Sequence, residues 1–356
     1  LVGSEMCIRD RNLGDTETLG KVGIRIVAFY IFTTALAIII SLSLASFIGP
    51  GKGMNMSIGD QSFESVDTEI SLVDTILDFI PTNPIEALAT GNMIQIIIFA
   101  VLVGLLIASM EDRLMTLGNI VTEMNDLMMG MTMRVMKLAP IGVFFLIART
   151  FSSLGYDAIL SMLSYMGSVL GGLAVQLVIV YMLLVIIFVR VNPFKFLKQF
   201  APVMTFGFST ASSSATVPVN IQTLEDMGVD KKISSFTIPL GATINMDGTA
   251  IMQGVAVIFI SNAYGIELTA TDFMTVIITA TIASVGTAGI PSVGLITLSM
   301  VLESVGLPVE GIAIIMGIDR ILDMARTAVN ITGDASGTMI VANSVGAFNK
   351  EKFNSK

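Results

Sequence analysis

The sequence contains no histidine and no tryptophan, and it has a single cysteine, Cys7. Without histidine, the chain has no imidazole to serve as a general base, a metal ligand or a proton relay. The one cysteine lies in a polar leader, so an internal disulfide and a cysteine metal site are both excluded. Soft metal ions are therefore disfavoured as ligands of this protein.

Charged residues are also scarce, at 13% of 356 residues, whereas soluble domains usually carry about 25%. Hydrophobic residues make up 53% of the chain, and the mean hydropathy is +0.83. These values predict an all-α integral membrane protein with several apolar spans, in contact with a lipid bilayer. The net charge of −9 argues against nucleic acid as a partner.

The apolar segments predict the order of the membrane spans. Residues 1–20 are polar and lack the apolar core of a signal peptide. They look partly non-native, which suggests an incomplete start. The acidic stretch 52–92 predicts an extracellular loop broken at Pro81 and Pro84. Apolar helices are expected over residues 24–48, 93–110, 114–138, 139–151 and 159–189.

The second half of the chain has polar interruptions inside apolar segments. FGFSTASSSATVPVN and ASVGTAGIPSVG predict two re-entrant helical hairpins, although an aqueous serine-rich loop is an alternative for the first. GATINMDGT breaks a helix, and a striped helix ends the series. Such paired interruptions in inverted repeats point to a transporter site near the membrane midplane. The ranges are 198–222 for hairpin 1, 233–264 for the broken helix, 271–305 for hairpin 2 and 311–345 for the last helix.

The distribution of lysine and arginine predicts the orientation of the spans. The leader, the C-terminal tail (349–356) and the connections at 190–198 and 231–232 are basic, whereas the connections at 52–92, 152–158, 263–272 and 303–310 hold one lysine and no arginine. The positive-inside rule then places both termini in the cytoplasm and makes the chain a multi-pass protein of the cytoplasmic membrane. The two hairpins would enter from opposite faces.

A polar stripe runs along the last apolar segment. On a helix, Asp319, Asp323, Arg326, Asn330 and Asp334 return to nearly one line. Each central charge costs roughly 2.5–3.5 kcal/mol to insert into a bilayer, so a random decoration is not expected. The stripe predicts a site for a small charged solute and its coupling ions, and the alternative is a set of ion pairs that hold helices together.

The stripe and the broken helix suggest what is bound. Arg326 suits a carboxylate and Asp323 an ammonium group, and an acidic amino acid offers both. A salt bridge between these two residues is the alternative. Oxygen ligands suit hard cations, which favours sodium over a proton-binding carboxylate. Two cation sites are expected, Asp247 with Tyr30, Thr33 and Thr34, and Asp334 with Asn245 and Asn330.

An enzyme is the alternative from another class. Asp247 and Asp334 could act as the paired acid and base of an intramembrane aspartyl protease. No Gly-x-Gly-Asp string surrounds either residue, which counts against this reading. We therefore expect a transporter and not an enzyme.

Four motifs resemble those of the dicarboxylate/amino acid:cation symporter family, which includes sodium-coupled glutamate and aspartate transporters. They are SSS before a proline, NMDGT, SVGTAGIPSVG and DMARTAVNITGD, and the resemblance runs from about Gly20 to the C-terminus. It implies a homotrimer whose transport domain (21–51 and 159–348) slides elevator-fashion against a scaffold (52–158). It also implies two further helices before the first span, so the chain looks N-terminally truncated.

The resemblance assigns roles to matching positions. It places Arg326 and Thr249 at the substrate side-chain carboxylate, Asp323 and Thr327 at the amino group, Ser213 and Asn330 at the main carboxylate, and backbone of Ala211, Ile290 and Gly294 around them. The three implied sodium sites are Gly241, Asn245, Asn330 and Asp334; Thr243, Ser284, Val285 and Thr287; and Tyr30, Thr33, Thr34, Asn245 and Asp247.

Departures from the family pattern refine these expectations. Ala211 stands where some members have an arginine, whose charge Arg320 could replace. Asp323 favours an amino acid over a plain dicarboxylate, and Asp334 favours sodium over protons. A proton-coupled or C4-dicarboxylate carrier of the same architecture remains the alternative.

Overall fold

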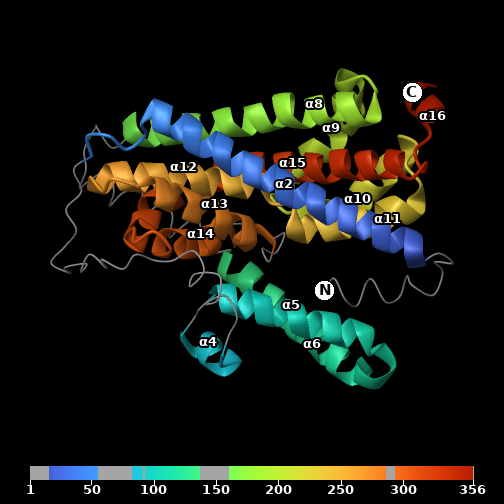
Figure 1. Cartoon of the computed structure of the whole chain (residues 1–356), viewed down its shortest axis with the longest axis horizontal. Helices are drawn as coiled ribbons and strands as arrows, with labels where there is room; N and C mark the ends of the chain where they lie inside the picture. Colours follow the sequence, from blue (N-terminus) through green and yellow to red (C-terminus); the bar gives the residue numbers. More distant parts are fainter. Residues whose placement is uncertain (1–15, 55–81, 91–92, 137–159, 286–292, 356) are drawn as a thin grey trace. The chain divides into compact units, whose positions relative to one another are not determined.

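The computed structural model describes residues 16–54, 82–90, 93–136, 160–285 and 293–355. These residues are mostly helical (Figure 1), and they contain no β-strand, only an antiparallel bridge between Val229 and Phe348. The expected all-α class is therefore confirmed. The chain divides into two compact units. The smaller unit holds the described residues between 82 and 136, and the larger unit holds the rest.

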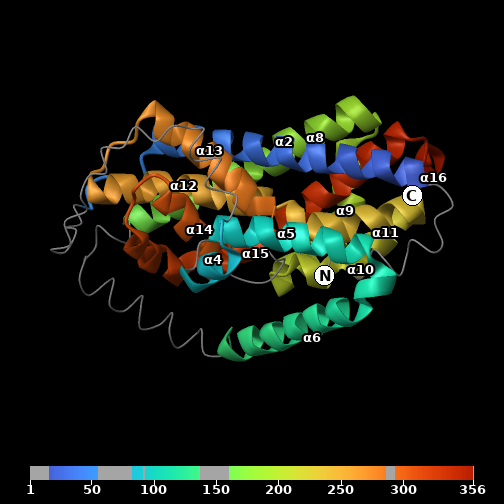
Figure 2. The same ribbon diagram turned by 60° about the horizontal axis from the view of Figure 1, so that its bottom comes forward.

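The smaller unit consists of three helices. They are α4 (Pro84–Thr90), α5 (Met93–Ser109) and α6 (Glu111–Met136), and Figure 2 shows α6 at full length. The predicted span 93–110 corresponds to α5. The predicted helix 114–138 overlaps α6 over residues 114–136, and residues 137 and 138 lie outside the described residues. The backbone leaves helical geometry at Leu114, near the start of α6. The prediction for 139–151 lies outside the described residues.

In the described part of the larger unit, three helical segments are long and apolar enough to cross a membrane. The first is α2 (Thr16–Ile48), of which residues 20–48 form the apolar part. The second, residues 160–189, is α-helical to 175 and continues through η1 (Gln176–Tyr181), α8 (Met182–Leu184) and η2 (Val185–Val189). Both η segments have the wider turn of a π-helix.

The third apolar segment is divided into two helices. α11 (Lys231–Ile244) ends and α12 (Asp247–Tyr264) begins on either side of Asn245 and Met246, inside the predicted interruption GATINMDGT. The Asn245 backbone is extended, which stops the helix. α12 packs along α2 and is buried over almost its whole length. The break places a carboxylate, Asp247, at the first turn of α12.

Two further pairs of helices occupy the positions of the predicted hairpins. α9 (Pro193–Thr210) and α10 (Ser213–Asp226) pack on each other, and α13 (Ala270–Val285) packs on α14 (Val293–Glu303). Ala211 turns the first pair with a positive φ of 50°, and the Ser212 side chain caps α10. The turn of the second pair lies outside the described residues.

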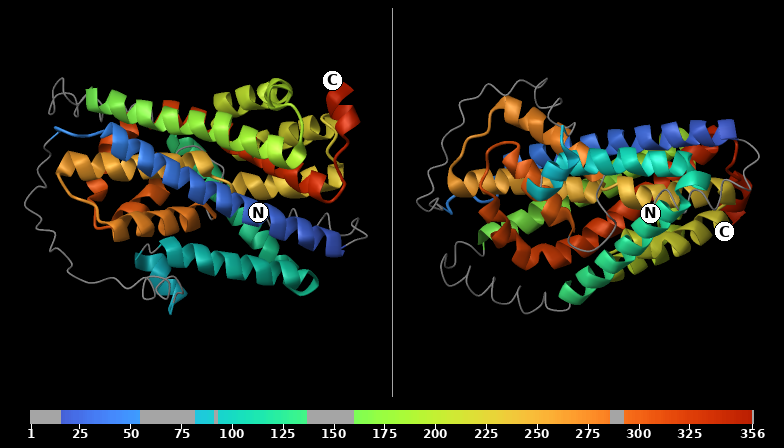
Figure 3. Two further views of the ribbon diagram at one scale, coloured as in Figure 1. Left: turned by 45° about the horizontal axis from the view of Figure 1, so that its top comes forward. Right: turned by 90° about the horizontal axis from the view of Figure 1, so that it is seen from below.

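The last long helix, α15 (Ile312–Ser344), lies among these elements. A short 3-10 turn, η3 (Val309–Gly311), precedes it. It packs against α9, α10, α11, α12 and α2, and the two views of Figure 3 show it inside the bundle. Twenty-one of its side chains are buried, including five of its polar stripe. A buried polar helix of this kind requires partners from the surrounding helices.

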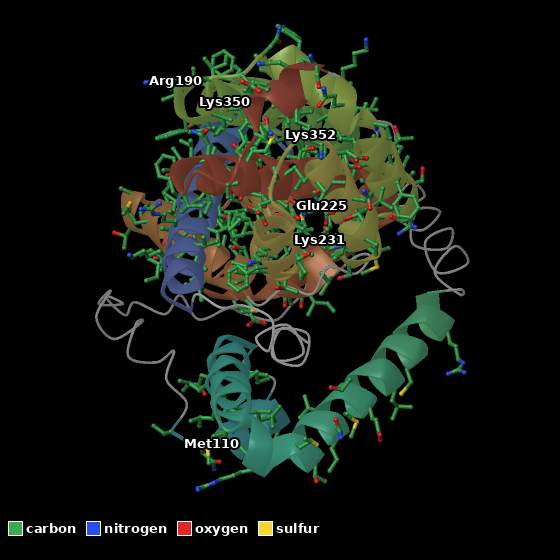
Figure 4. All side chains as sticks on the ribbon, turned by 90° about the vertical axis from the view of Figure 1, so that its right-hand side faces the viewer. Met110, Arg190, Glu225, Lys231, Lys350 and Lys352 are labelled. Carbon is green, nitrogen blue, oxygen red and sulfur yellow. The ribbon has the colours of Figure 1, made fainter. Side chains whose placement is uncertain are left out.

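The C-terminus folds back onto the base of the α9–α10 pair. In α16 (Lys350–Ser355), the Phe353 side chain is fully buried. Lys352 donates a hydrogen bond to the carbonyl of Glu225 on α10, and Lys195 on α9 donates one to the carbonyl of Asn354. Figure 4 looks at this end of the larger unit, where Arg190, Lys231, Lys350 and Lys352 also lie.

Candidate substrate and cation site

The stripe on α15 is buried, and its arginine pairs with two carboxylates of the same helix. Nη1 of Arg326 lies 2.6 Å from Asp319 and Nη2 lies 2.8 Å from Asp323. Arg326 is only 1% exposed. The i,i+3 salt bridge weighed from the sequence is therefore present, and Asp319 adds a second one. Both ion pairs of Arg326 lie within α15, so neither of them joins two helices.

Arg326 retains donors that these pairs do not use. A guanidinium carries five N–H groups, and its Nε has no hydrogen-bond partner among the described residues. Thr249 and Gly294 border the group: a Cβ added to Gly294 would lie 2.8 Å from Cγ2 of Thr249 and 3.7 Å from Nη2 of Arg326. The structure thus brings together three of the predicted substrate residues, from α12, α14 and α15.

The neighbours of Arg326 on α15 show how the other charges are placed. Asp323 is 7% exposed, and its second oxygen lies 3.9 Å from Arg320, a half-exposed side chain. The Thr327 hydroxyl, expected at the amino group of a substrate, donates to the backbone carbonyl of Asp323 in this structure. Asp323 therefore stands between one buried and one accessible arginine.

Asp334 lies at the break between α11 and α12. The Asn245 side chain donates one hydrogen bond of 2.9 Å to Asp334 and one of 3.1 Å to the Asn330 carbonyl. The Asn330 side-chain oxygen accepts from the backbone N–H of Gly248. Gly241 completes the cluster, because a Cβ there would lie 2.6 Å from both Asp334 Oδ1 and the Tyr30 hydroxyl. These contacts assemble the first predicted cation set.

Asp247 is surrounded by neutral donors from two other helical segments. Oδ1 accepts a 2.7 Å hydrogen bond from Thr34 on α2. Oδ2 accepts 2.9 Å and 2.7 Å hydrogen bonds from Gln176 and Tyr181. Thr34 was predicted from the sequence, whereas Gln176 and Tyr181 were missed. A lone amide inside the long apolar segment 160–189 was the available signal, because intramembrane polar groups are costly and usually functional.

The two remaining members of this set lie on α2. The Tyr30 hydroxyl donates to the carbonyl of Thr237, and the Thr33 hydroxyl donates to the carbonyl of Tyr30. Both side chains are fully buried, as is Asp247. Of the three predicted hydroxyls, Thr34 bonds directly to the Asp247 carboxylate, whereas Tyr30 and Thr33 donate to backbone carbonyls.

For the other predicted site residues, the structure describes only part of the expected sites. Ala211 and Ser213 are buried at the turn between α9 and α10, and α10 packs on α15. The hydroxyls of Thr243 and Ser284 bond to carbonyls of their own helices, and Val285 ends α13. Thr287 and Ile290 lie outside the described residues. The structure thus leaves the cation set of Thr243, Ser284, Val285 and Thr287, and the substrate contact at Ile290, without a complete geometry.

The two carboxylates fit cation binding through oxygen rather than through a soft-metal cluster. The described residues contain no group of three histidine, cysteine, aspartate or glutamate side chains. Neither Asp247 nor Asp334 forms an ion pair within the described part of the chain. The side-chain oxygens of Asn245 and Gln176 are buried and accept no hydrogen bond there. Buried acceptors without donors are suitable ligands for a hard cation.

Comparison with known proteins settles the family. The model of the sodium:dicarboxylate symporter family matches residues 11–344. The chain belongs to this family. It is 34% identical to a proton/sodium-glutamate symport protein of Bacillus caldotenax, over 99% of this chain and 85% of that protein. It is 35% identical to excitatory amino acid transporter 3 of Mus musculus over 92% and 72%. A proton/glutamate-aspartate symporter of Escherichia coli (strain K12) is 32% identical, over 99% and 83%.

Membership of this family confirms two expectations from the sequence. The relatives are symporters and not enzymes, so the aspartyl protease alternative is set aside. The family and the apolar helices together identify a membrane protein of the glutamate transporter group.

Proposed function

We propose that this protein couples the inward movement of sodium to the uptake of acidic amino acids, aspartate or glutamate, across the cytoplasmic membrane. One observation carries the proposal: a buried arginine, Arg326, lies on the same helix as a buried carboxylate, Asp334, that has no cationic partner among the described residues. The arginine suits an anionic solute, and the carboxylate suits a cation. An uncompensated carboxylate at membrane depth is costly, so a bound cation would stabilise it.

Substrate recognition would use the unoccupied edge of the Arg326 guanidinium. Nε and the second N–H of Nη2 lie on one side of the group and match the two oxygens of a carboxylate. Asp323 would bind the amino group, with Thr327 released from its backbone hydrogen bond. Since Arg326 is 1% exposed and α14 borders it at Gly294, α14 would have to move for a substrate to enter. Ser213 and Asn330 would hold the main carboxylate.

Cation coupling would use the two clusters at the helix break. Asp334 with Asn245, Asn330 and the Gly241 carbonyl would form one sodium site, and Asp247 with Thr34, Thr33 and Tyr30 another. Asn245 bonds to Asp334 and precedes Asp247 by two residues, so it connects the two clusters. A third site would use Thr243, Ser284, Val285 and Thr287. Sodium bound between these helices would fix the break in the form that supports Arg326.

The division of the chain into two compact units supports an elevator mechanism, which the family resemblance associates with a homotrimer. The first span clusters with residues 160–355 rather than with α4–α6, in keeping with a transport domain and a separate scaffold. The pairs α9–α10 and α13–α14 would be re-entrant hairpins and act as two gates. The basic residues at the end seen in Figure 4 support a cytoplasmic location for that end, and hence for both termini.

Uptake measurements test the proposal. Proteoliposomes that contain the full chain should accumulate labelled aspartate when sodium is outside, and replacement of sodium by choline should abolish the accumulation. Undiminished uptake in choline would exclude sodium coupling. A neutral amino acid of similar size serves as the control substrate, because it lacks the carboxylate that Arg326 would bind.

A second candidate is a proton-coupled or C4-dicarboxylate carrier with the same architecture. It is favoured by the relatives named proton/glutamate-aspartate symporters, and by Asp247 and Asp334, which could each carry a proton. Succinate would then compete with labelled aspartate as well as unlabelled aspartate does. The presence of Asp323 at an amine-binding position favours the amino acid over succinate.

A further inference from the structure

The two oxygens of Asp247 have different surroundings. Oδ2 accepts hydrogen bonds from Gln176 and Tyr181, both on the segment 160–189, whereas Oδ1 accepts one, from Thr34 on α2. Gln176, Tyr181 and Asp247 are fully buried. Oδ2 is therefore capped by two donors, and Oδ1 retains capacity on the side of the α2 hydroxyls.

A local change of helix type makes this capping possible. In an α-helix, two residues five positions apart are separated by about 140° around the axis. The i→i+5 hydrogen bonds of a π-helix instead stack such residues one turn apart. The π-helical turn η1 begins at Gln176 and ends at Tyr181, so it brings both side chains to one oxygen. π-helical turns are uncommon and occur frequently at functional sites.

The hydrogen-bond network also fixes the orientation of the Gln176 amide. Its nitrogen faces two acceptors, Asp247 Oδ2 and the backbone carbonyl of Thr33. Since both partners only accept, the NH₂ group must point to them. The amide thus links the carboxylate to the backbone of α2 next to Thr34. Gly333 leaves room for this arrangement, because a Cβ there would lie 2.5 Å from the Tyr181 hydroxyl.

We propose that Gln176 and Tyr181 are positioning residues of the Asp247 cation site, and that they determine its affinity and its selectivity among alkali cations. They hold Oδ2, so that Oδ1 and the α2 hydroxyls face the cation at a fixed spacing. A fixed spacing discriminates between sodium and the smaller lithium ion, because a rigid set of oxygens cannot contract around lithium. This inference rests on the proposed cation site but assigns two residues that no resemblance supplied.

Three variants and one background test the proposal. Tyr181→Phe and Gln176→Met each remove a donor at nearly constant volume. Tyr165→Phe is the matched control, because Tyr165 is buried on the same segment and its hydroxyl has no partner among the described residues. Asp247→Asn provides the background for a double-mutant cycle. Unfolding temperatures of the purified full chain, measured against sodium or lithium chloride with choline chloride at constant ionic strength, give the apparent dissociation constants.

The expected result is specific to the cation. Tyr181→Phe and Gln176→Met should each raise the sodium dissociation constant about tenfold, as losses of supporting hydrogen bonds do at metal sites. Both should reduce the ratio by which the protein prefers sodium over lithium, and both variants should remain folded in choline. Tyr165→Phe should match the parent. In the Asp247→Asn background, Tyr181→Phe should have no further effect on sodium.

Three outcomes overturn the proposal, and they show whether the proposed function fails with it. If the parent binds sodium but both variants bind it within about twofold of the parent, well below the loss expected of a supporting hydrogen bond, the positioning role is wrong while the proposed function stands. The same holds if Tyr181→Phe weakens sodium binding equally in the Asp247→Asn background. If the parent shows no stabilisation by sodium or lithium, both the positioning role and sodium coupling fail.

Discussion

Arg326 donates a 2.6 Å hydrogen bond to Asp319, seven residues earlier on the same helix. The arginine side chain therefore lies along α15 and does not reach to a neighbouring helix for its counter-charge. A second carboxylate on α15, Asp323, also accepts a hydrogen bond from Arg326. Because α15 carries its own counter-ions, α14 could move away from Arg326 without breaking an ion pair between helices. This property suits a site that must open and close.

Substitution of Arg326 should have two separable effects. Arg326→Met leaves Asp319 buried without a cation and leaves Asp323 with only the exposed Arg320, so we expect the substrate-free protein to lose roughly 3–5 kcal/mol of stability. The double variant Arg326→Met/Asp319→Asn should recover part of this loss. In uptake assays, both variants should lose far more of their aspartate uptake than of their uptake of a neutral amino acid. Equal weakening of both substrates would assign Arg326 a folding role alone.

Gly241 should be required for the close approach of Asp334 and Tyr30. In Gly241→Ala, the added methyl group would lie 2.6 Å from both oxygens, so the carboxylate and the hydroxyl would be pushed apart. We expect weaker sodium dependence of uptake and a lower unfolding temperature. Gly167→Ala is the control, because no atom lies within 4 Å of its added Cβ and alanine is the better helix former by up to about 1 kcal/mol. Equal effects of the two changes would contradict the packing argument.

Much of this structure could be predicted because polar residues interrupt the apolar segments of the sequence at a few positions. The break at Asn245 and Met246 follows from polar residues and Gly248 within an apolar segment, and the structure places it there. The stripe on α15 follows from helical periodicity alone, and its members are buried as expected. In both cases, the cost of polar groups at membrane depth makes a local pattern informative.

Contacts between distant segments could not be predicted in the same way. Gln176 and Tyr181 are five residues apart, and an α-helical reading places them on different faces. The π-helical turn brings them together at Asp247. No periodicity in the sequence predicts this turn. The pairing of Arg326 with Asp319 was similarly hidden, because an arginine on a stripe with three carboxylates has several possible partners.

The fold-back of the C-terminus should contribute to stability. Phe353 is fully buried, and Lys195 lies 5.9 Å above its ring. Phe353→Ala should therefore destabilise the protein by about 3–5 kcal/mol, as other losses of a buried phenylalanine do. Thermal unfolding in detergent measures the change. Phe194→Ala, at a side chain that is 79% exposed on α9, should have little effect in the same assay. A similar loss in both variants would indicate that α16 is not a packing element.

Neutralisation of Asp334 should separate cation binding from folding. Asp334 accepts a hydrogen bond from Asn245 but forms no ion pair among the described residues, so Asp334→Asn breaks no salt bridge. A neutral amide of the same shape costs less to bury than a carboxylate, so the fold should persist. The cation site, however, loses its charge. We therefore expect Asp334→Asn to keep its unfolding temperature in choline and to require a much higher sodium concentration for half-maximal uptake.

Asp272→Asn, at a partly exposed position near the start of α13, is the charge-matched control and should leave the sodium dependence unchanged. Unfolding of Asp334→Asn in choline would show that the carboxylate serves the fold, and an unchanged sodium requirement would remove Asp334 from the cation site.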